Sequence, residues 1–471
     1  MHYLNISSAR QGALHQPPGA NVSIDLWKTL GLTAMALVTA PAISAVAAPP
    51  ASVISAADLR ADLQTAIDAI EKNHPDLGHS VDKATLRRTA RLIRRDLDRP
   101  MDQTQAWSVL AQLNPVLADG HLLIGLPDWR TSAASATEHG APWFPFEVSV
   151  AASGRLRLIA LLGGAPSADA GRSISRINGV PAKEVVRTLL NRTHGDTPSA
   201  RAALLSQRWW LFYAKVYGTQ ATFDLEFADR RGREQLAASR TVLPAVLQRD
   251  ASFERLFRCE MRGTGAVLTV STFFWPDKAR FFAFTEACFT KMAKEQVHHL
   301  VIDIRENGGG DDDMWRDGIL RYIADQPYRH GSHYIKRVLT PGPGEVAGQL
   351  VEGTIESIVQ PATSEAAHFT GEVNVLVGPL TYSSAVLFSN VVQDYRFGNL
   401  VGVGKSVRTR QSGGIRTLIL PNSGLVLSYP RFVLDRPSGA RRPMWLTPDR
   451  QIADDPLNPQ APIDALLQTS D

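Results

Sequence analysis

Two short segments of this chain place small residues and backbone N–H groups directly after apolar, strand-like runs. In the first, the apolar run 300–304 leads into Arg305-Glu-Asn-Gly-Gly-Gly310. In the second, the apolar run 373–378 leads into Thr381-Tyr-Ser-Ser-Ala385 and then into a helical pattern. Three successive glycines can adopt positive φ and turn N–H groups toward a negative oxygen. A serine at the start of a helix lies at its positive end, where the next N–H can bind the same oxygen.

Each segment also has an ordinary explanation when it is taken alone. Glycine runs are common in flexible turns, and Ser383 or Ser384 could serve as the N-cap of the following helix. On adjacent strands of one sheet, however, the two segments resemble the two halves of an oxyanion hole. Such a hole would hold a negatively charged oxygen beside a serine hydroxyl.

The elements around these segments predict an α/β domain over 221–471. Strand-like and helical patterns alternate there, and the strands are continuous apolar runs of the kind that parallel sheets bury on both faces. Alternation of this kind predicts right-handed βαβ units. The expected strands cover 266–273, 300–304, 373–378 and 400–403, and the expected helices cover 277–294, 315–323 and 384–395.

Two smaller regions precede this domain. Amphipathic patterns predict a helical domain over 50–125, which opens with the capping sequence Ser55-x-x-Asp58. That domain ends in a tight turn, Asp119-Gly120-His121, followed by a strand. Over 140–220 short strands come first, including a pair around the Asn178-Gly179 turn, and helices follow.

Four of these segments resemble parts of the tail-specific (C-terminal-processing) peptidase family, which includes the tricorn-type proteases, and they follow one another along the chain as in that family. Residues 300–310 are similar to its Asp-x-Arg-x-Asn-x-Gly-Gly signature, and 375–385 to its nucleophile segment. Residues 171–181 resemble its PDZ-like segment, and 119–121 resemble the turn that carries a histidine base in the tricorn-like branch. The resemblance implies a crotonase-like (ClpP-type) ββα catalytic domain, an N-terminal helical domain and a small PDZ-like β segment.

The same resemblance implies roles for individual residues. Ser383 would be the nucleophile, His121 the general base, and the N–H groups of Gly309 and Ser384 the oxyanion hole. No metal or cofactor is needed for this chemistry.

The chain departs from the family's commoner pattern at two positions. Val386 stands where many members carry a glutamate, and Arg408 stands where most carry a lysine base. An arginine stays protonated and cannot act as a base, and Lys405 lies three residues away from the expected position. A Ser/His arrangement is therefore favoured over a Ser/Lys dyad. The carboxylate that orients His121 is left open among Glu306, Asp394 and Asp435, each of which could also be an ordinary loop or helix carboxylate.

The N-terminus and the cysteines bear on location. Lys28, the mildly apolar run 29–47 and the small residues that end it have the parts of a secretory signal peptide over 1–47. We therefore expect an exported protein, periplasmic or secreted, that begins near Ala48 and is not inserted in a membrane. An uncleaved anchor is the alternative, although such a weakly apolar run spans a bilayer poorly. Cys259 and Cys288 could form one disulfide or remain two buried thiols.

The sequence thus predicts an exported serine endopeptidase whose partner is a peptide or protein substrate. The alternative is an inactive family member that binds peptides or apolar ligands in the same cleft. Nucleic acid is not an expected partner, because the net charge is only +4 and the basic residues are scattered. The sequence carries no signal for an oligomeric state.

Overall fold

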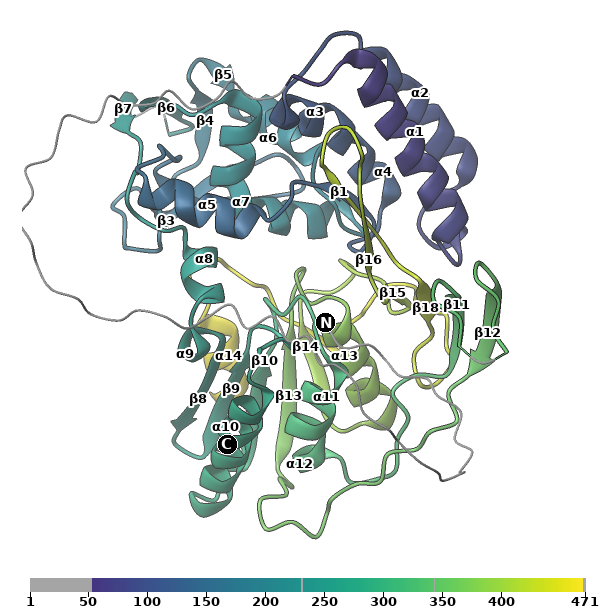
Figure 1. Ribbon diagram of the computed structural model, residues 1–471. Helices are drawn as coiled ribbons and strands as arrows, with labels where there is room; N and C mark the ends of the chain where they lie inside the picture. Colours follow the sequence, from purple (N-terminus) through teal and green to yellow (C-terminus); the bar gives the residue numbers. More distant parts are fainter. Residues whose placement is uncertain (1–52, 230–231, 343, 469–471) are drawn as a thin grey trace, which may run out of the picture.

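The protein has two lobes, one above the other in Figure 1. The computed structural model describes residues 53–229, 232–342 and 344–468. The expected signal peptide over 1–47 and the expected mature start at Ala48 lie outside these ranges. The upper lobe comes mainly from the first half of the chain, and the lower lobe comes from the second half.

The core of the lower lobe is a six-stranded sheet with the strand order β19-β14-β13-β10-β9-β8. Neighbouring strands from β9 to β19 run parallel, and β8 is antiparallel at one edge. The strands are β8 (Phe257–Arg262), β9 (Gly265–Val270), β10 (His299–Asp303), β13 (Glu372–Val377), β14 (Asn399–Gly402) and β19 (Arg450–Gln451). The predicted parallel α/β sheet is thus confirmed.

Helices cover both faces of this sheet, which explains why its strands are apolar throughout. On one face Leu300 and Ile302 share a core with Phe388 of α13 (Ser384–Tyr395) and with α10 (Lys278–Lys294). On the other face Val301 packs in a second cluster with Ile463 of α14 (Ala461–Gln468). The segment after β10 forms α11 (Asp312–Trp315), one wide π turn (Arg316–Leu320) and α12 (Arg321–Ile323).

The upper lobe begins with a group of helices that share one apolar core. Ser55 caps the first helix by accepting a hydrogen bond from the N–H of Asp58, as predicted. The elements are α1 (Ala56–Asn73), α2 (Lys83–Asp96), α3 (Gln103–Leu110), α4 (Asn114–Leu117), β1 (Leu123–Gly125) and α5 (Trp129–Glu138).

A hairpin from the C-terminal part of the chain completes this lobe. Its strands, β16 (Arg416–Ile419) and β17 (Val426–Tyr429), rise from the lower lobe into the upper one in Figure 1. β17 pairs antiparallel with β1, in the register Ile124 opposite Leu427. Leu420 and Leu425 join the same core as α1 to α3. The two lobes are therefore joined by a shared sheet.

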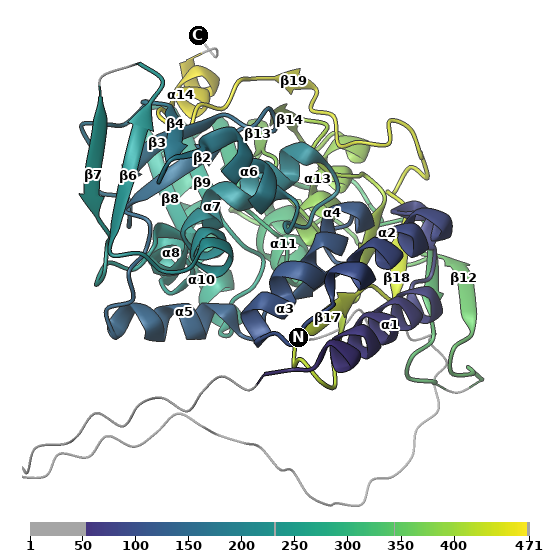
Figure 2. The ribbon, with the colours of Figure 1, turned by 90° about the horizontal axis from the view of Figure 1, so that it is seen from above.

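The rest of the upper lobe is built on two small sheets. One pairs β2 (Phe146–Val150) with β3 (Leu156–Leu161), and the other has the order β5-β4-β6-β7. The remaining elements are β4 (Ile174–Ile177), β5 (Val180–Pro181), α6 (Ala182–Leu190), α7 (Pro198–Tyr217), β6 (Thr222–Phe227) and β7 (Arg233–Ala237). Although β6 and β7 follow residue 220, they extend the sheet of β4 at one end of the upper lobe, opposite α1 and α2 (Figure 2).

A further four-stranded sheet lies beside the lower lobe in the order β12-β11-β18-β15. Its strands are β11 (His333–Arg337), β12 (Leu350–Thr354), β15 (Gln411–Gly413) and β18 (Phe432–Leu434). Two short helices, α8 (Ala245–Asp250) and α9 (Phe253–Leu256), connect the lobes.

The two cysteines form a disulfide that joins edge strand β8 to helix α10. Cys259 and Cys288 are bonded, with their Cα atoms 6.0 Å apart. The sequence had left a bridge and two buried thiols as alternatives, and the structure selects the bridge.

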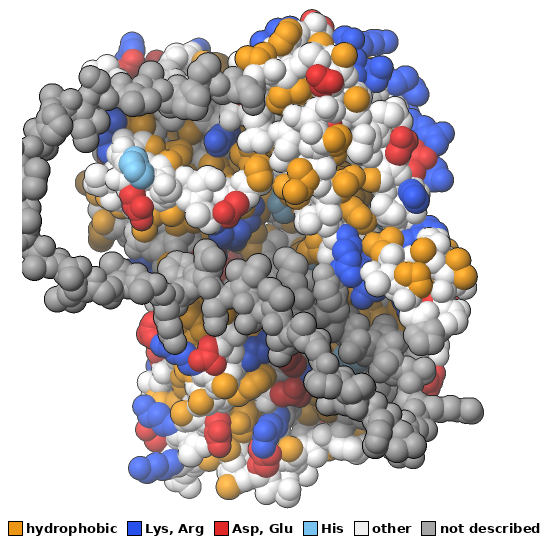
Figure 3. Space-filling view, in the orientation of Figure 1, with side chains coloured by type: hydrophobic (Ala, Val, Ile, Leu, Met, Phe, Trp, Pro, Cys, Tyr) orange, Lys and Arg blue, Asp and Glu red, His pale blue; other side chains and the backbone are white. Residues whose placement is uncertain are grey.

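The surface carries one basic helix. Lys and Arg side chains gather along α2 at the edge of the upper lobe in Figure 3, and Arg88, Arg91 and Arg95 are exposed there. Of the helices in the described ranges, none has the length and apolar character that a membrane span requires. Those same ranges hold no group of three or more metal-binding side chains.

Candidate active site

Ser383 lies at a sharp turn between strand β13 and helix α13. Its backbone has φ 53° and ψ −125°, a conformation that few residues other than glycine adopt. The next residue begins α13, so Ser383 stands at the positive end of a 12-residue helix. Its side chain is half-buried. This strand–turn–helix arrangement, with a serine at the strained position, presents a hydroxyl group at the edge of the sheet.

The glycine segment after β10 holds this turn in place. The N–H of Tyr382 donates to the carbonyl of Asn307 (2.9 Å), and the hydroxyl of Thr381 donates to the carbonyl of Ile304 (2.9 Å). Gly309, with φ 97°, is packed so closely that a Cβ there would lie 2.6 Å from Cβ of Ser383. Only glycine fits this contact, so the two sequence segments that suggested chemistry do lie together.

Ser384, the neighbouring serine, is committed to a different role. Its side chain is buried, its hydroxyl is hydrogen-bonded to Asp312, and it accepts a bond from Nε1 of Trp315 (3.0 Å). Burial raises the pKa of Asp312, although the bond from Ser384 lowers it. Ser384 therefore packs inward, which leaves Ser383 as the more accessible hydroxyl of the pair.

The two N–H groups predicted to form the oxyanion hole differ in the structure. That of Ser384 has no hydrogen-bond partner among the described residues. That of Gly309 donates to Oδ1 of Asn307 (2.8 Å). A substrate oxygen beside Ser383 could thus accept a hydrogen bond from the N–H of Ser384, whereas the N–H of Gly309 is already bonded to Asn307.

His121 reaches the site from the upper lobe, on the turn that follows α4. Ala118 adopts the left-handed conformation (φ 48°, ψ 41°) and redirects the chain into Asp119-Gly120-His121. At Gly120 a Cβ would lie 2.5 Å from the ring of Tyr382, so the close approach requires glycine. The ring of His121 lies 4.8 Å from the ring of Tyr382, the residue before Ser383. The Asp-Gly-His turn and the serine turn are therefore neighbours.

A hydroxyl group connects His121 to a carboxylate. Nδ1 of His121 lies 2.9 Å from Oγ of Ser412 in β15, and that oxygen lies 2.9 Å from Oδ1 of Asp119. Burial alone would raise the pKa of Asp119, but the surrounding imidazoles of His74, His121 and His79 hold it well below its usual range. A carboxylate can only accept, so Ser412 donates to Asp119 and accepts from Nδ1–H of His121. This order leaves Nε2 of His121 unprotonated.

The pKa of His121 favours the neutral ring. The side chain is 5% exposed, and burial lowers its pKa, although the charge of Asp119 opposes that effect. Within the described residues Nε2 has no hydrogen-bond partner. A buried, neutral imidazole with a fixed tautomer and an available nitrogen is suited to accept a proton.

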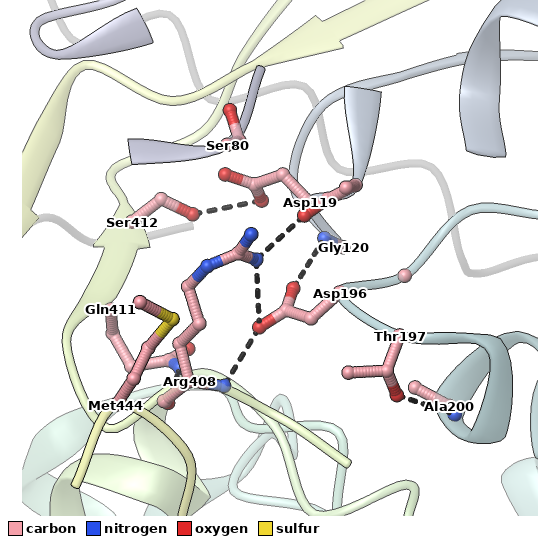
Figure 4. A network of polar contacts seen from close by, with 12 residues as sticks. Ser80, Asp119, Gly120, Asp196, Thr197, Ala200, Arg408, Gln411, Ser412 and Met444 are labelled. Carbon is pink, nitrogen blue, oxygen red and sulfur yellow. Dashed lines mark hydrogen bonds and ion pairs between the residues drawn. The ribbon is translucent and has the colours of Figure 1, made fainter. Parts of the chain in front are cut away.

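Arg408 supports the histidine turn from the lower lobe, as Figure 4 shows. Its Nη1 donates to the carbonyl of Ala118 (2.6 Å) and lies 3.4 Å from Oδ2 of Asp196. Oδ1 of Asp196 accepts bonds from the N–H of Gly120 (3.3 Å) and the hydroxyl of Tyr382 (2.8 Å). Burial and the nearby charge of Asp119 raise the pKa of Asp196 to about 6, although Arg408 lowers it. Arg408 thus occupies the position at which a lysine base was considered, and its contacts with Ala118 and Asp196 hold the histidine turn in place.

Several residues considered from the sequence lie away from this centre. Lys405 is exposed, and no hydrogen bond or ion pair joins its side chain to the described residues of the site. The three carboxylates considered as partners of His121 belong to other ion pairs: Glu306 pairs with Arg249, Asp394 with Arg436, and Asp435 with Arg410. The carboxylate nearest to His121 is instead Asp119, two residues before it.

Comparison with known proteins identifies the lower lobe. Residues 266–452 match the model of Peptidase family S41. These residues form an S41 peptidase domain. The domain contains Ser383, Gly309, Arg408 and Ser412, whereas Asp119 and His121 come from the upper lobe, outside the matched range. The match covers less than half of the chain, and it relates this domain to serine peptidases.

Solved structures share the arrangement of the S41 domain and the upper lobe together. Mature CPAF in complex with lactacystin aligns with a TM-score of 0.61 at 13% identity, over 88% of this chain and 97% of that one. Mature CPAF alone aligns with a TM-score of 0.59 at 13% identity, over 88% and 96%. At this identity the likeness shows the fold alone. A search of curated protein sequences found no match.

Two residues of the candidate active site were missed from the sequence, Asp119 and Ser412. Asp119 was visible in the Asp-Gly-His turn but was not considered as the orienting carboxylate. Ser412 lies 291 residues from His121 and has no motif around it, so nothing in the sequence pointed to it.

Proposed function

We propose that this protein is an exported serine endopeptidase that cleaves peptide bonds through an acyl-enzyme on Ser383, with His121 as the general base. The observation that carries the proposal is the Asp119–Ser412–His121 chain of hydrogen bonds, which ends beside the turn of Ser383. It supplies a base with a fixed tautomer next to a serine at the positive end of a helix.

In the proposed reaction, Oγ of Ser383 attacks the peptide carbonyl while its proton passes to Nε2 of His121. The N–H of Ser384 binds the oxyanion, and each such donor contributes roughly 3–4 kcal/mol in comparable sites. Gly309 can add a second donor if its N–H is shared with Asn307. The carbon–nitrogen bond then breaks, and His121 returns the proton to the leaving amine. Water, deprotonated by the same histidine, then attacks the acyl carbon; the bond from that carbon to Oγ of Ser383 breaks, and His121 returns the proton to Oγ.

We also infer the finer fold relationships that the sequence suggested. The parallel sheet with helices on both faces supports a crotonase-like ββα arrangement for the lower lobe. The sheet β5-β4-β6-β7, with the Asn178-Gly179 turn between β4 and β5, supports the PDZ-like segment.

Export is proposed on two grounds. The first is the signal-like composition of 1–47, and the second is the Cys259–Cys288 disulfide, because such bonds persist in oxidising compartments. N-terminal sequencing of protein from the periplasm or medium of the native host should find a start near Ala48. Recovery of intact Met1 in a membrane fraction would instead show an anchor.

The function is tested by two serine variants. Ser383→Ala should abolish hydrolysis of casein and labelling by a serine-reactive phosphonate, with the fold retained. Ser384→Ala is the matched control and should keep the label, because its hydroxyl is bonded to Asp312 and Trp315. If Ser384→Ala loses the label and Ser383→Ala keeps it, the nucleophile is Ser384. Wild-type protein that binds peptides and neither cleaves nor labels would favour the inactive binding alternative.

A further inference from the structure

Two buried polar atoms beside the Asp119–Ser412–His121 chain of hydrogen bonds face each other. One is Nε2 of His74 and the other is Oδ2 of Asp119; they lie 4.0 Å apart, on side chains that are 0% and 1% exposed. Neither atom has a hydrogen-bond partner among the described residues. A buried donor or acceptor that stays unpaired costs stability. We therefore expect the two atoms to bond, either directly after a small side-chain rotation or through one water molecule.

The local backbone fixes which nitrogen of His74 carries the proton. His74 follows the last residue of α1, and Pro75 stops the helix there. The chain turns, and the N–H of Asp76 donates to Nδ1 of His74 (3.2 Å). A ring nitrogen that accepts a hydrogen bond carries no proton, so the proton of this ring lies on Nε2. The atom that faces Asp119 is therefore a donor, as a carboxylate oxygen requires.

The two oxygens of Asp119 are held differently. Oδ1 accepts from the hydroxyl of Ser412 (2.9 Å) and from the N–H of His121 (2.7 Å). Oδ2 faces the Nε2–H of His74. A carboxylate held at one oxygen can still turn about its Cβ–Cγ bond, and such a turn would move Oδ1 relative to Ser412. A donor at Oδ2 opposes this rotation.

A second contact ties the loop of His74 to the strand that carries Ser412. Oδ2 of Asp76 accepts from Nη1 of Arg410 (2.7 Å), and Arg410 lies two residues before Ser412. Nε of the same arginine donates to the buried Asp435 (2.6 Å). The loop after α1 is thereby held against the start of β15, and His74 keeps its place beside the carboxylate.

We propose that His74 is a positioning residue of the candidate active site, whose Nε2–H binds Oδ2 of Asp119. The bond holds the carboxylate in the orientation that directs the hydroxyl of Ser412 and, through it, Nδ1 of His121. This inference rests on the proposed peptidase function. In this scheme His74 acts through Asp119 and does not itself contact the substrate.

The first test requires no catalysis. ¹⁵N NMR of histidine-labelled Ser383→Ala distinguishes a ring nitrogen that carries a proton from one that does not, and comparison with Ser383→Ala/His74→Gln assigns the signals of His74. At about pH 8, where an ordinary imidazole is neutral, we expect the proton on Nε2. Its signal should move when Asp119→Asn is added, because that change weakens the bond. A proton on Nδ1, or a signal that stays in place, would overturn the proposal.

The second test is kinetic. His74→Leu should lower kcat roughly 10- to 100-fold with KM nearly unchanged, because a hydrogen bond to a charged group is lost and substrate contacts are kept. His74→Gln should recover most of this loss, since its amide N–H can replace Nε2–H. The matched control is His299→Leu: His299 also lies beside a carboxylate, 3.5 Å from Glu372 at the start of β10, and this variant should keep the wild-type kcat. A folded His74→Leu protein with the wild-type kcat would refute the role.

A double-variant cycle separates positioning from general structural damage. If His74 acts through Asp119, His74→Leu should have almost no further effect on kcat once Asp119→Asn is present. Additive losses would show that His74 acts on another group and would remove the assignment. Thermal melting checks that each variant is folded.

The two kinds of measurement also separate this inference from the proposed function. A wild-type protein that cleaves no peptide would remove the peptidase proposal, and the bond between His74 and Asp119 would then stand or fall on the NMR result. Cleavage by the wild-type protein, with kcat independent of His74, would leave the peptidase proposal standing and remove this one.

Discussion

Replacing Asp119 by asparagine tests the hydroxyl-linked chain most directly. The substitution keeps the shape of a buried side chain and removes only its charge. Oδ1 of Asp119 is linked to Nδ1 of His121 through two hydrogen bonds of 2.9 Å at Ser412, so the two atoms lie within about 6 Å of each other. At that separation a unit charge stabilises the imidazolium of the transition state by about 3 kcal/mol at an effective dielectric constant near 20. We therefore expect kcat to fall by roughly 100-fold.

The pH profile gives a second, independent signature of the same change. Asp119 raises the pKa of His121 against the effect of burial, so the pKa should fall further in Asp119→Asn. The base is active when neutral, and the acid limb of kcat/KM should therefore move to lower pH while the plateau drops.

The matched control is Asp394→Asn, which removes a carboxylate paired with Arg436 and should leave kcat within a few-fold of wild type. Both variants are assayed on one chromogenic peptide after thermal melting has confirmed folding. A folded Asp119→Asn protein with nearly wild-type kcat, or an acid limb that does not move, would refute the proposed chain of hydrogen bonds.

Three further results are expected. His121→Ala should lower kcat by several powers of ten, whereas Lys405→Ala should have a kcat close to that of the wild type. The acid limb of the wild-type pH profile should lie below the ordinary histidine pKa of 6.5, because burial lowers the pKa of His121. An inactive Lys405→Ala protein beside an active His121→Ala protein would show that Lys405, and not His121, is the base. Arg408→Met should lower the free energy of unfolding by about 3–5 kcal/mol in urea titrations, because it leaves the buried Asp196 without its cationic partner. Adding Asp196→Asn to this variant should restore part of the lost stability. Replacing Cys259 and Cys288 together by alanine should cost about 3–4 kcal/mol in the same titration, given the 29-residue separation, and reducing agent should then have no effect on the variant.

The sequence predicted best those elements whose signals are local. The hydroxyl of Ser55 caps α1, and α13 covers 384–395 as its periodicity indicated. The buried strands were recognised because residues covered on both faces form continuous apolar runs. The hairpin-like strands β11 and β12 were not predicted, since none of their residues is fully buried and neither strand contains a continuous apolar run.

Contacts between distant parts of the chain were the least predictable. The pairing of β4 with β6 places residues after 220 in the upper lobe, although the sequence suggested that they begin the catalytic domain. The bond between Ser412 and Asp119 spans 293 residues. Such contacts depend on the folded backbone, and no pattern of residue types encodes them.

The pairing of β1 with β17 has a consequence for when this enzyme can become active during its synthesis. Leu123 precedes its partner Ser428 by about 300 residues, so the ribosome produces the histidine-bearing lobe long before the strand that completes it. At about 5–20 residues per second the delay is roughly 15–60 s. Throughout that interval His121 has neither Ser412 nor the serine turn beside it, so the proposed active site is not assembled in the nascent chain. Under the proposed mechanism, the protein gains its proteolytic activity only after almost the whole chain has left the ribosome.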